Sequence, residues 1–376
     1  MERVYAITGH RLNATYSLSK LMWMRDMEPQ TFARADGFLL AKDFLVARLT
    51  GQRMTDPSDA SSTDAYDLRS GAWSAELLVA AGLPSSLFPE VRPSTTVAGG
   101  VLAERAAETG LLAGTPVVIG GGDGPMAALG AGITSAASGA YAYLGSSSWV
   151  SSSSDSPLDD PLMRTMTFAH VVPGQFVPTA TMQAGGASVK WLADLLDEGR
   201  HDLFEHDTVA AADGLFFLPH LLGERSPYWN PRARAAFIGL LMHHGRPELA
   251  RAVIEGVAFT LLTGVRAFRE LGVPFDRLSV IGGAAKSSVL LRVMADAWGA
   301  SITPRSLVDE ATSIGAAVVG GVAIGVFDGF DVAASASALG TTIEPDAGAR
   351  AMYADAYPRF LDAYARLEPW FDELPR

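Results

Sequence analysis

Two stretches in which an apolar strand runs into consecutive glycines and then into a helix constrain the fold of this chain most. Residues 116–119 are apolar on both faces and lead into Gly120-Gly121-Gly122-Asp123, and residues 278–281 lead in the same way into Gly282-Gly283. Strands without a polar face are typical of buried parallel sheets. The pattern predicts an α/β protein with one such unit in each of two domains, which we place at residues 1–132 and 133–376.

The remaining elements follow from hydrophobic spacing and from turn-forming residues. Residues 56–63 are rich in Asp, Ser and Pro and predict a loop. Gly299 is well placed to end the helix that follows the second glycine turn. A further strand is expected at 140–144, and further helices at 16–50, 75–82, 103–109, 126–132, 287–298, 310–324 and 350–376.

Composition excludes several classes of function. The 376 residues are 48% hydrophobic, carry a net charge of −12 and contain no cysteine. The acidic balance argues against a broad basic face for nucleic acid or acidic membranes, and the lack of cysteine excludes disulfides, thiolate metal sites and a cysteine nucleophile. No apolar run approaches the roughly 20 residues that a membrane-spanning helix needs, and the N-terminus does not resemble a signal peptide. We therefore expect a soluble, cytoplasmic protein without nucleic-acid or membrane partners.

Asp123 is the first candidate for chemistry. Ligands of open α/β sheets bind beyond the carboxyl ends of the strands, where glycines let a substrate approach the backbone. A carboxylate at this edge can accept a proton from a hydroxyl group that attacks a phosphoryl group. From the local pattern alone, an Asp123 that only caps the following helix is equally consistent.

Two further turns have the composition of phosphate or nucleotide sites. The turn at 145–148 offers small hydroxyl side chains and backbone amides, although an ordinary flexible serine loop has the same composition. The turn at 282–287 joins a strand to a helix, but its glycine spacing matches neither the Walker nor the Rossmann pattern.

Taken together and in order, these segments resemble the FGGY family of carbohydrate kinases. Residues 282–287 resemble the family's adenosine motif, and residues 145–149 resemble its second phosphate motif, with Ser146 where Thr is usual. Residues 235–240 and 248–256 resemble one family signature closely, and residues 17–23 resemble another imperfectly. Residues 223–227 and 114–123 fit best among xylulokinase-like members. The resemblance covers essentially the whole chain.

The resemblance implies a role for individual residues. Asp123 would be the catalytic base and would contact the sugar together with Gly124 and, more weakly, Thr15. Lys190 is equally consistent with a solvated helix lysine, and Glu224 and Arg225 are at least as consistent with a structural turn. The residues that would contact the nucleotide are Gly145, Ser146, Gly186, Lys190, Gly283 and Ser287.

The fold implied is two ribonuclease-H-like, actin-like domains around a cleft that holds ATP, Mg²⁺ and the sugar. The activity implied is ATP-dependent phosphorylation of a sugar hydroxyl. The expected acceptor is a pentulose such as D-xylulose, and gluconate, ribulose and other polyols or ketoses are the alternatives. No residue is assigned as a metal ligand.

The sequence departs from the family pattern in two places. It has no Asp-x-Gly-Thr segment of the kind that opens family members and grips phosphate, so we expect a truncated first domain. A kinase that lost its start, a non-catalytic nucleotide-binding fragment and half of a split kinase all fit this observation. A homodimer or a complementing N-terminal polypeptide is the expected protein partner. In addition, Gly124 stands where xylulokinases usually have Asn, which leaves the sugar open.

Overall fold

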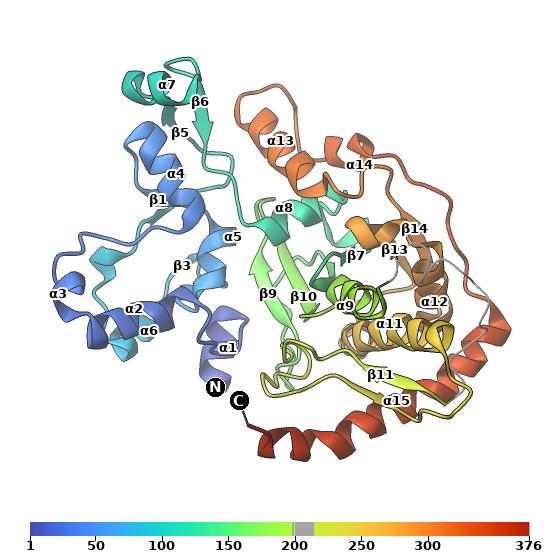
Figure 1. Cartoon of the computed structure of the whole chain (residues 1–376). Helices are drawn as coiled ribbons and strands as arrows, with labels where there is room; N and C mark the ends of the chain where they lie inside the picture. Colours follow the sequence, from blue (N-terminus) through green and yellow to red (C-terminus); the bar gives the residue numbers. More distant parts are fainter. Residues whose placement is uncertain (198, 200–213, 376) are drawn as a thin grey trace. The chain divides into compact units, whose positions relative to one another are not determined.

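The computed structural model describes residues 1–197, 199 and 214–375. These residues form two compact units, each made of several chain segments (Figure 1). Unit 1 comprises Met1–Ser138, Ser152–Pro178 and Glu310–Ala336, and unit 2 comprises Gly139–Ser151, Thr179–Asp309 and Ser337–Arg376. In the described part of the chain, no helix is long and apolar enough to cross a membrane.

Unit 1 is largely helical, and many of its strands are short and paired in twos. β1 lies parallel to β4, whereas β2 pairs antiparallel with β3 and β5 pairs antiparallel with β6. Its helices are α1 (Glu2–Thr8), α2 (Ser17–Met27), α3 (Pro29–Phe32), α4 (Ala41–Thr50), α5 (Pro57–Ala60), α6 (Ala75–Ala81), α7 (Ala103–Thr109), α8 (Asp123–Gly130), α13 (Ala311–Ala323) and α14 (Val332–Ala336). Its strands include β1 (Met54–Thr55), β2 (Tyr66–Asp67), β3 (Ala72–Trp73), β4 (Glu90–Val91), β5 (Val97–Gly100), β6 (Pro116–Val118) and β9 (Met166–Ala169).

The expectation of a buried parallel strand at 116–119 is wrong. This segment forms β6, which pairs antiparallel with β5. Pro116 is exposed, and only Ile119 at the end of the segment is fully buried. The apolar run therefore supplies one strand of an antiparallel pair and one buried side chain. An apolar run of only four residues does not predict burial well. It does not specify which strand it will pair with, and the position of that partner determines how much of the run is covered.

The expected loop at 56–63 is also wrong. Its first part is α5, and a 3₁₀ turn over Ser61–Thr63 follows directly. The Asp56 side chain accepts hydrogen bonds from the Ser58 and Asp59 N–H groups, and Pro57 occupies the first helical position. Asp followed by Pro favours a turn, but it also caps a helix start, and here the second preference prevails.

Two helices of unit 1 touch through glycines. An added Cβ on Gly130 of α8 would lie 1.7 Å from the Ala311 carbonyl oxygen at the start of α13. One on Gly315 of α13 would lie 2.1 Å from the Met126 carbonyl oxygen of α8. The two backbones therefore approach each other too closely for any side chain. Met126, Leu129, Val318 and Val319 complete the apolar core around this contact.

Unit 2 is built on a mixed sheet. The strands of this sheet that belong wholly or partly to unit 2 lie in the order β14 (Ser301–Pro304), β13 (Arg277–Ile281), β7 (Ala140–Leu144), β8 (Ser148–Ser152) and β10 (Phe176–Met182). β13 is parallel to both β7 and β14, and β8 is antiparallel to β10. The predicted strands at 140–144 and 278–281 are thus confirmed, and the parallel pairing places their carboxyl ends at one edge.

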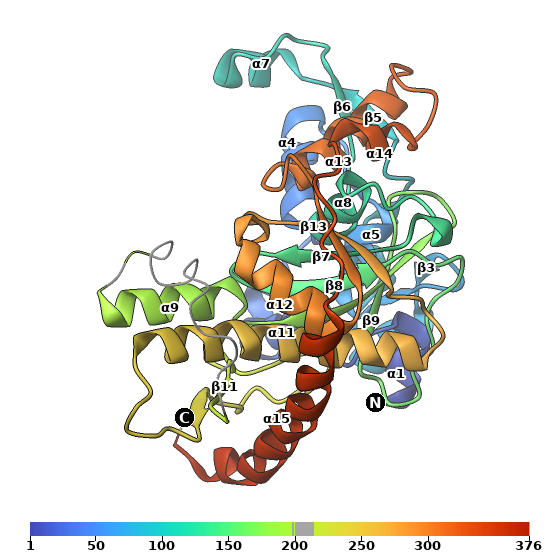
Figure 2. The same cartoon turned by 90° about the vertical axis from the view of Figure 1, so that its right-hand side faces the viewer.

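Helices cover this sheet (Figure 2). α11 (Arg246–Glu270) packs against α9 (Gly186–Leu196), α12 (Ser288–Trp298) and α15 (Ala347–Glu373). The antiparallel pair of β11 (Phe216–Leu218) and β12 (Ala236–Ile238) lies beside α11. At Gly264 an added Cβ on α11 would lie 2.7 Å from the Ala180 Cβ of β10, so the helix rests directly on the sheet. Gly299 ends α12 in the left-handed conformation with φ 57°, as predicted.

Candidate functional site

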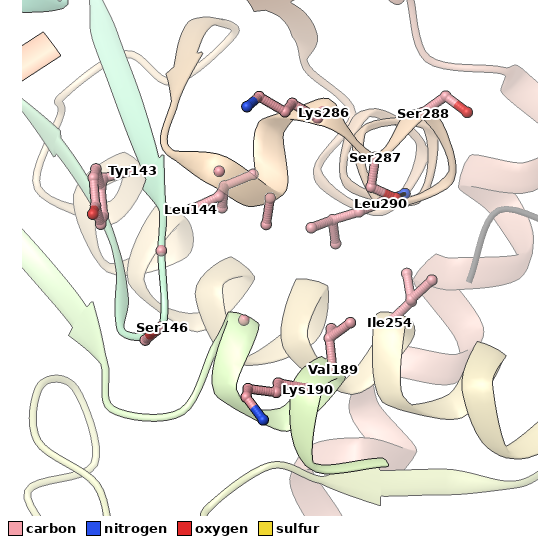
Figure 3. A pocket seen from close by; sticks show the side chains of 14 residues that line it. Tyr143, Leu144, Ser146, Val189, Lys190, Ile254, Lys286, Ser287, Ser288 and Leu290 are labelled. Carbon is pink, nitrogen blue, oxygen red and sulfur yellow. Dashed lines mark hydrogen bonds between the residues drawn. The ribbon is translucent and has the colours of Figure 1, made fainter. Parts of the chain in front are cut away.

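A cavity of about 570 Å³ opens in unit 2 where β7 and β13 end (Figure 3). The starts of α9 and α12 and one face of α11 form its other walls. Its volume lies in the range of small-molecule sites, and its place beyond the carboxyl ends of parallel strands is where α/β sheets bind ligands. All six residues predicted to contact a nucleotide line it: Gly145, Ser146, Gly186, Lys190, Gly283 and Ser287.

One corner of the cavity is made by backbone alone. The Gly186 N–H donates to the Gly145 carbonyl oxygen at 2.8 Å, and the Ala187 N–H donates to the Ser146 carbonyl oxygen at 3.1 Å. An added Cβ on Gly186 would lie 2.6 Å from the Gly145 oxygen. Glycine is therefore required where the β7–β8 turn meets the start of α9, and the corner stays open to a ligand.

The opposite wall is the glycine turn after β13. Gly282 has φ 92°, and an added Cβ there would lie 2.7 Å from the Leu144 carbonyl oxygen. A 3₁₀ turn over Gly283–Lys286 follows, and Ser287 then caps α12 by accepting a hydrogen bond from the Leu290 N–H at 3.2 Å. The Lys286 ammonium pairs with Asp309 at 2.5 Å.

The apolar part of the lining was not anticipated from the sequence. Figure 3 shows Val189, Ile254 and Leu290 from three helices around the same space. Helical spacing could have indicated Val189 and Leu290. Val189 follows Gly186 by three positions and Leu290 follows Ser287 by three, and residues three apart in a helix lie on the same face. The other residues missed are Tyr143, Leu144, Ala284, Lys286 and Ser288.

Lys190 retains both of its interpretations. It lines the cavity, yet its side chain is exposed and forms an ion pair with Asp194 one turn further along α9. Such a pair is what a solvated helix lysine makes, and it also leaves the ammonium close to any ligand in the cavity.

In unit 1, Asp123 occupies the first turn of α8. The residue is exposed, and its Oδ1 accepts a hydrogen bond from the Gly124 N–H at 2.8 Å. Gly122, not Asp123, is the N-cap residue of the helix. An added Cβ on Gly124 would meet open space, so the position after the carboxylate has room for a substrate group.

A buried ionic cluster adjoins the glycine loop that precedes Asp123. The Lys42 ammonium lies 2.6 Å from Asp43 Oδ1, 3.3 Å from Asp56 Oδ1 and 3.5 Å from Asp59 Oδ2. Burial raises the pKa of Asp59 to about 6, with Lys42 opposing the shift and the other two carboxylates adding to it. One cation among three carboxylates does not balance their charge. The remaining negative charge adds to the effect of burial in raising the pKa of the partly exposed Asp59.

Two other residues considered from the sequence are neither part of the cavity lining nor part of the Lys42 cluster. Thr15 is exposed in the turn before α2, and its N–H donates to Asn13 Oδ1 at 2.9 Å. Glu224 in unit 2 is buried, accepts hydrogen bonds from the Gln183 and Arg225 N–H groups, and lies 3.4 Å from His220 Nδ1. These contacts favour the structural interpretation of Glu224.

Residues 1–197, 199 and 214–375 contain no group of three or more His, Asp or Glu side chains that could hold an ion. A magnesium ion that accompanies a nucleotide takes most of its ligands from phosphates and water, so it needs no such group.

Comparison with known proteins identifies the family of the chain. Residues 1–130 match the N-terminal domain, and residues 140–324 the C-terminal domain, of the FGGY family of carbohydrate kinases. The chain is 33% identical to a xylulose kinase of Escherichia coli over 314 residues, which are 83% of this chain and 64% of that protein. It is 29% identical to a gluconokinase of Bacillus licheniformis over 388 residues, covering 99% of this chain and 75% of the relative.

Solved structures agree with this match. The xylulose kinase of Rhodospirillum rubrum superimposes with a TM-score of 0.85 at 32% identity, over 99% of this chain and 76% of that one. The fold is accordingly the two-domain α/β fold of these sugar kinases, as the resemblance implied. The chain spans slightly less than two thirds of the length of its Escherichia coli relative. By its two matched domains, this chain belongs to the FGGY family of carbohydrate kinases.

Proposed function

We propose that this protein transfers the γ-phosphoryl group of ATP to a hydroxyl group of a sugar, with D-xylulose as the leading acceptor. The observation that carries the proposal is the cavity of unit 2. Six residues chosen from three separate segments of the sequence line one space of about 570 Å³, together with an apolar wall suited to a base. The glycine corner at Gly186 leaves room for a ligand to approach the backbone.

Different residues bind the nucleotide and accept the proton in this proposal. Gly145 and Ser146 contact the phosphates, and Gly283 and Ser287 hold the nucleoside. When bound, ATP supplies the phosphoryl group and its magnesium ion neutralises the developing charge. Asp123 accepts the proton of the attacking sugar hydroxyl, a role for which its exposed carboxylate at the start of α8 is suited.

The choice of acceptor rests on relatives. Those from Escherichia coli and Rhodospirillum rubrum are named xylulose kinases, whereas that from Bacillus licheniformis is named a gluconokinase. Gly124 offers open space beside the carboxylate in place of a side chain, so it permits a pentulose without selecting one.

A coupled assay of ADP release tests the proposal in the full-length protein. We expect turnover with D-xylulose, ATP and Mg²⁺, and weaker or no turnover with gluconate, ribulose and glycerol. Asp123→Asn is the matched control: it should lower the rate by about 10²–10⁴-fold, because it removes a general base, and leave ATP affinity within a few-fold. Activity confined to gluconate or glycerol would overturn the acceptor, and wild-type turnover by Asp123→Asn would overturn the role of Asp123.

A further inference from the structure

The Gly121–Gly122 peptide, which precedes the peptide bond to Asp123, donates its N–H to a buried hydroxyl group. Ser58 Oγ accepts a hydrogen bond from the Gly122 N–H at 2.8 Å and donates one to Asp56 Oδ2 at 2.5 Å. Ser58 is only 1% exposed. We propose that Ser58 is a positioning residue that fixes the Gly121–Gly122 peptide and thereby aims the carboxylate of Asp123. This inference rests on the proposed function of Asp123.

Asp56 determines which way the Ser58 hydroxyl points. A carboxylate can only accept hydrogen bonds, and Asp56 Oδ2 accepts from the Ser58 N–H at 3.0 Å, from Ser58 Oγ and from Ser94 Oγ at 2.8 Å. The hydroxyl proton of Ser58 is therefore donated to Asp56, and a lone pair of Ser58 Oγ is left to accept the hydrogen bond from the Gly122 N–H. The other oxygen of this carboxylate, Asp56 Oδ1, lies 3.3 Å from the Lys42 ammonium.

The glycine loop also fits closely against this support. An added Cβ on Gly121 would lie 2.7 Å from Ser58 Oγ and 2.4 Å from Val171 Cγ1. One residue earlier, the Gly120 N–H donates to the Ser94 carbonyl oxygen at 3.0 Å. The loop is thus held at Gly120 by a backbone group and at Gly122 by the Ser58 side chain.

The link to catalysis is the covalent connection between Gly122 and Asp123. Loss of the Ser58 acceptor frees the N–H of the Gly121–Gly122 peptide, whereas the Gly122 carbonyl oxygen still accepts a hydrogen bond from the Met126 N–H at 3.0 Å. The cavity-lining residues of unit 2 are unchanged by this loss. Reaction rates are sensitive to such changes, since a displacement of 1 Å can cost about 10²-fold. A positioning role therefore predicts a loss of kcat without a matching change in KM.

Ser58→Ala and Ser94→Ala form a matched pair. Both remove one buried hydroxyl that donates to the same oxygen of Asp56, but only Ser58 contacts the glycine loop through its side chain. In the full-length protein we expect Ser58→Ala to lower kcat by about 10–100-fold, with KM for ATP and sugar within about two-fold. Ser94→Ala should keep kcat within about three-fold of wild type and show a similar thermal midpoint to Ser58→Ala.

A second measurement does not depend on turnover. With ¹⁵N-glycine labelling, the Gly122 amide should exchange its hydrogen at least about ten-fold faster in Ser58→Ala than in wild type or Ser94→Ala, because its acceptor is gone. Unchanged Gly122 exchange, or equal losses of kcat in the two serine variants, would overturn the inference.

Failure of the proposed function gives a different result. If Asp123 is not the base, Asp123→Asn keeps its turnover. If Ser58 does not position Asp123, Asp123→Asn loses turnover while Ser58→Ala keeps it.

Discussion

At the scale of single residues, the most consequential feature is the excess of negative charge around Lys42. One ammonium group faces three carboxylates within 3.5 Å, and two of these, Asp43 and Asp56, are fully buried. Asp59 retains some solvent contact, and burial raises its pKa to about 6. A carboxyl group that holds its proton more tightly when folded makes the folded state less stable as pH rises.

This reasoning predicts a pH-dependent gain in stability for Asp59→Asn. An unfolded Asp has a pKa of about 3.9, so between about pH 4 and 6 the folded state binds more protons and wild-type stability falls with rising pH. The asparagine variant lacks this loss. Relative to wild type, its free energy of unfolding should increase by on the order of 2–3 kcal/mol from pH 4 to pH 7.

Urea unfolding at pH 4, 5, 6 and 7 measures the difference. Asp36→Asn, an exposed carboxylate on the same unit, controls for the loss of one negative charge. A difference between Asp59→Asn and wild type that stays constant over this range would contradict the prediction.

At the scale of elements, glycines determine where helices can meet. Sequence patterns place α12 and its terminal Gly299 correctly, because a helix stop is a local signal. Gly130 and Gly315 carry no such signal. Their role appears only in the contact of α8 with α13, where the backbones themselves are the packing surface.

Gly130→Ala and Gly320→Ala should therefore change stability in opposite directions. The new methyl group at position 130 would overlap the Ala311 carbonyl, and we expect a loss of about 3 kcal/mol or more. Gly320 lies in α13 with open space around its Cβ position, and alanine there should stabilise the protein by about 0.5–1 kcal/mol. Thermal or urea unfolding of both variants, compared with wild type, measures the two changes in stability. Similar losses in the two would show that the contact between α8 and α13 has no special role.

At the scale of the whole molecule, the two units are interleaved along the chain. Unit 1 includes 152–178 and 310–336 in addition to the N-terminal segment, and the cavity is lined by residues of unit 2. The proposed base and the proposed nucleotide cavity therefore belong to different units, so nucleotide binding and phosphoryl transfer should respond to different substitutions.

Val189→Trp tests this separation. Val189 faces the cavity, and a tryptophan there would fill part of the space (Figure 3). We expect the Kd for ADP, measured by calorimetry, to rise by at least about ten-fold, a cost of about 1.4 kcal/mol. Leu195→Trp, at an exposed position of the same helix outside the cavity lining, should leave the Kd within about two-fold. Equal effects of the two tryptophans would contradict a nucleotide site in this cavity.

Local patterns in the sequence were enough to predict several of the strands and helices that the structure contains. Strands at 140–144 and 278–281 and the end of α12 at Gly299 follow from short-range spacing, whereas the helix expected at 16–50 is divided into α2, α3 and α4. The family resemblance selected six residues that line one cavity. Such signals are reliable because each depends on neighbouring residues alone.

Only the tertiary structure decided the remainder. It paired 116–118 with β5 and brought Ser58 to Gly122 across 64 positions of sequence. A buried hydroxyl or carboxylate takes its role from the partner it meets on folding, because an unpaired polar group in the interior is costly. No sequence period encodes that partner, so the support of Asp123 became visible only in three dimensions.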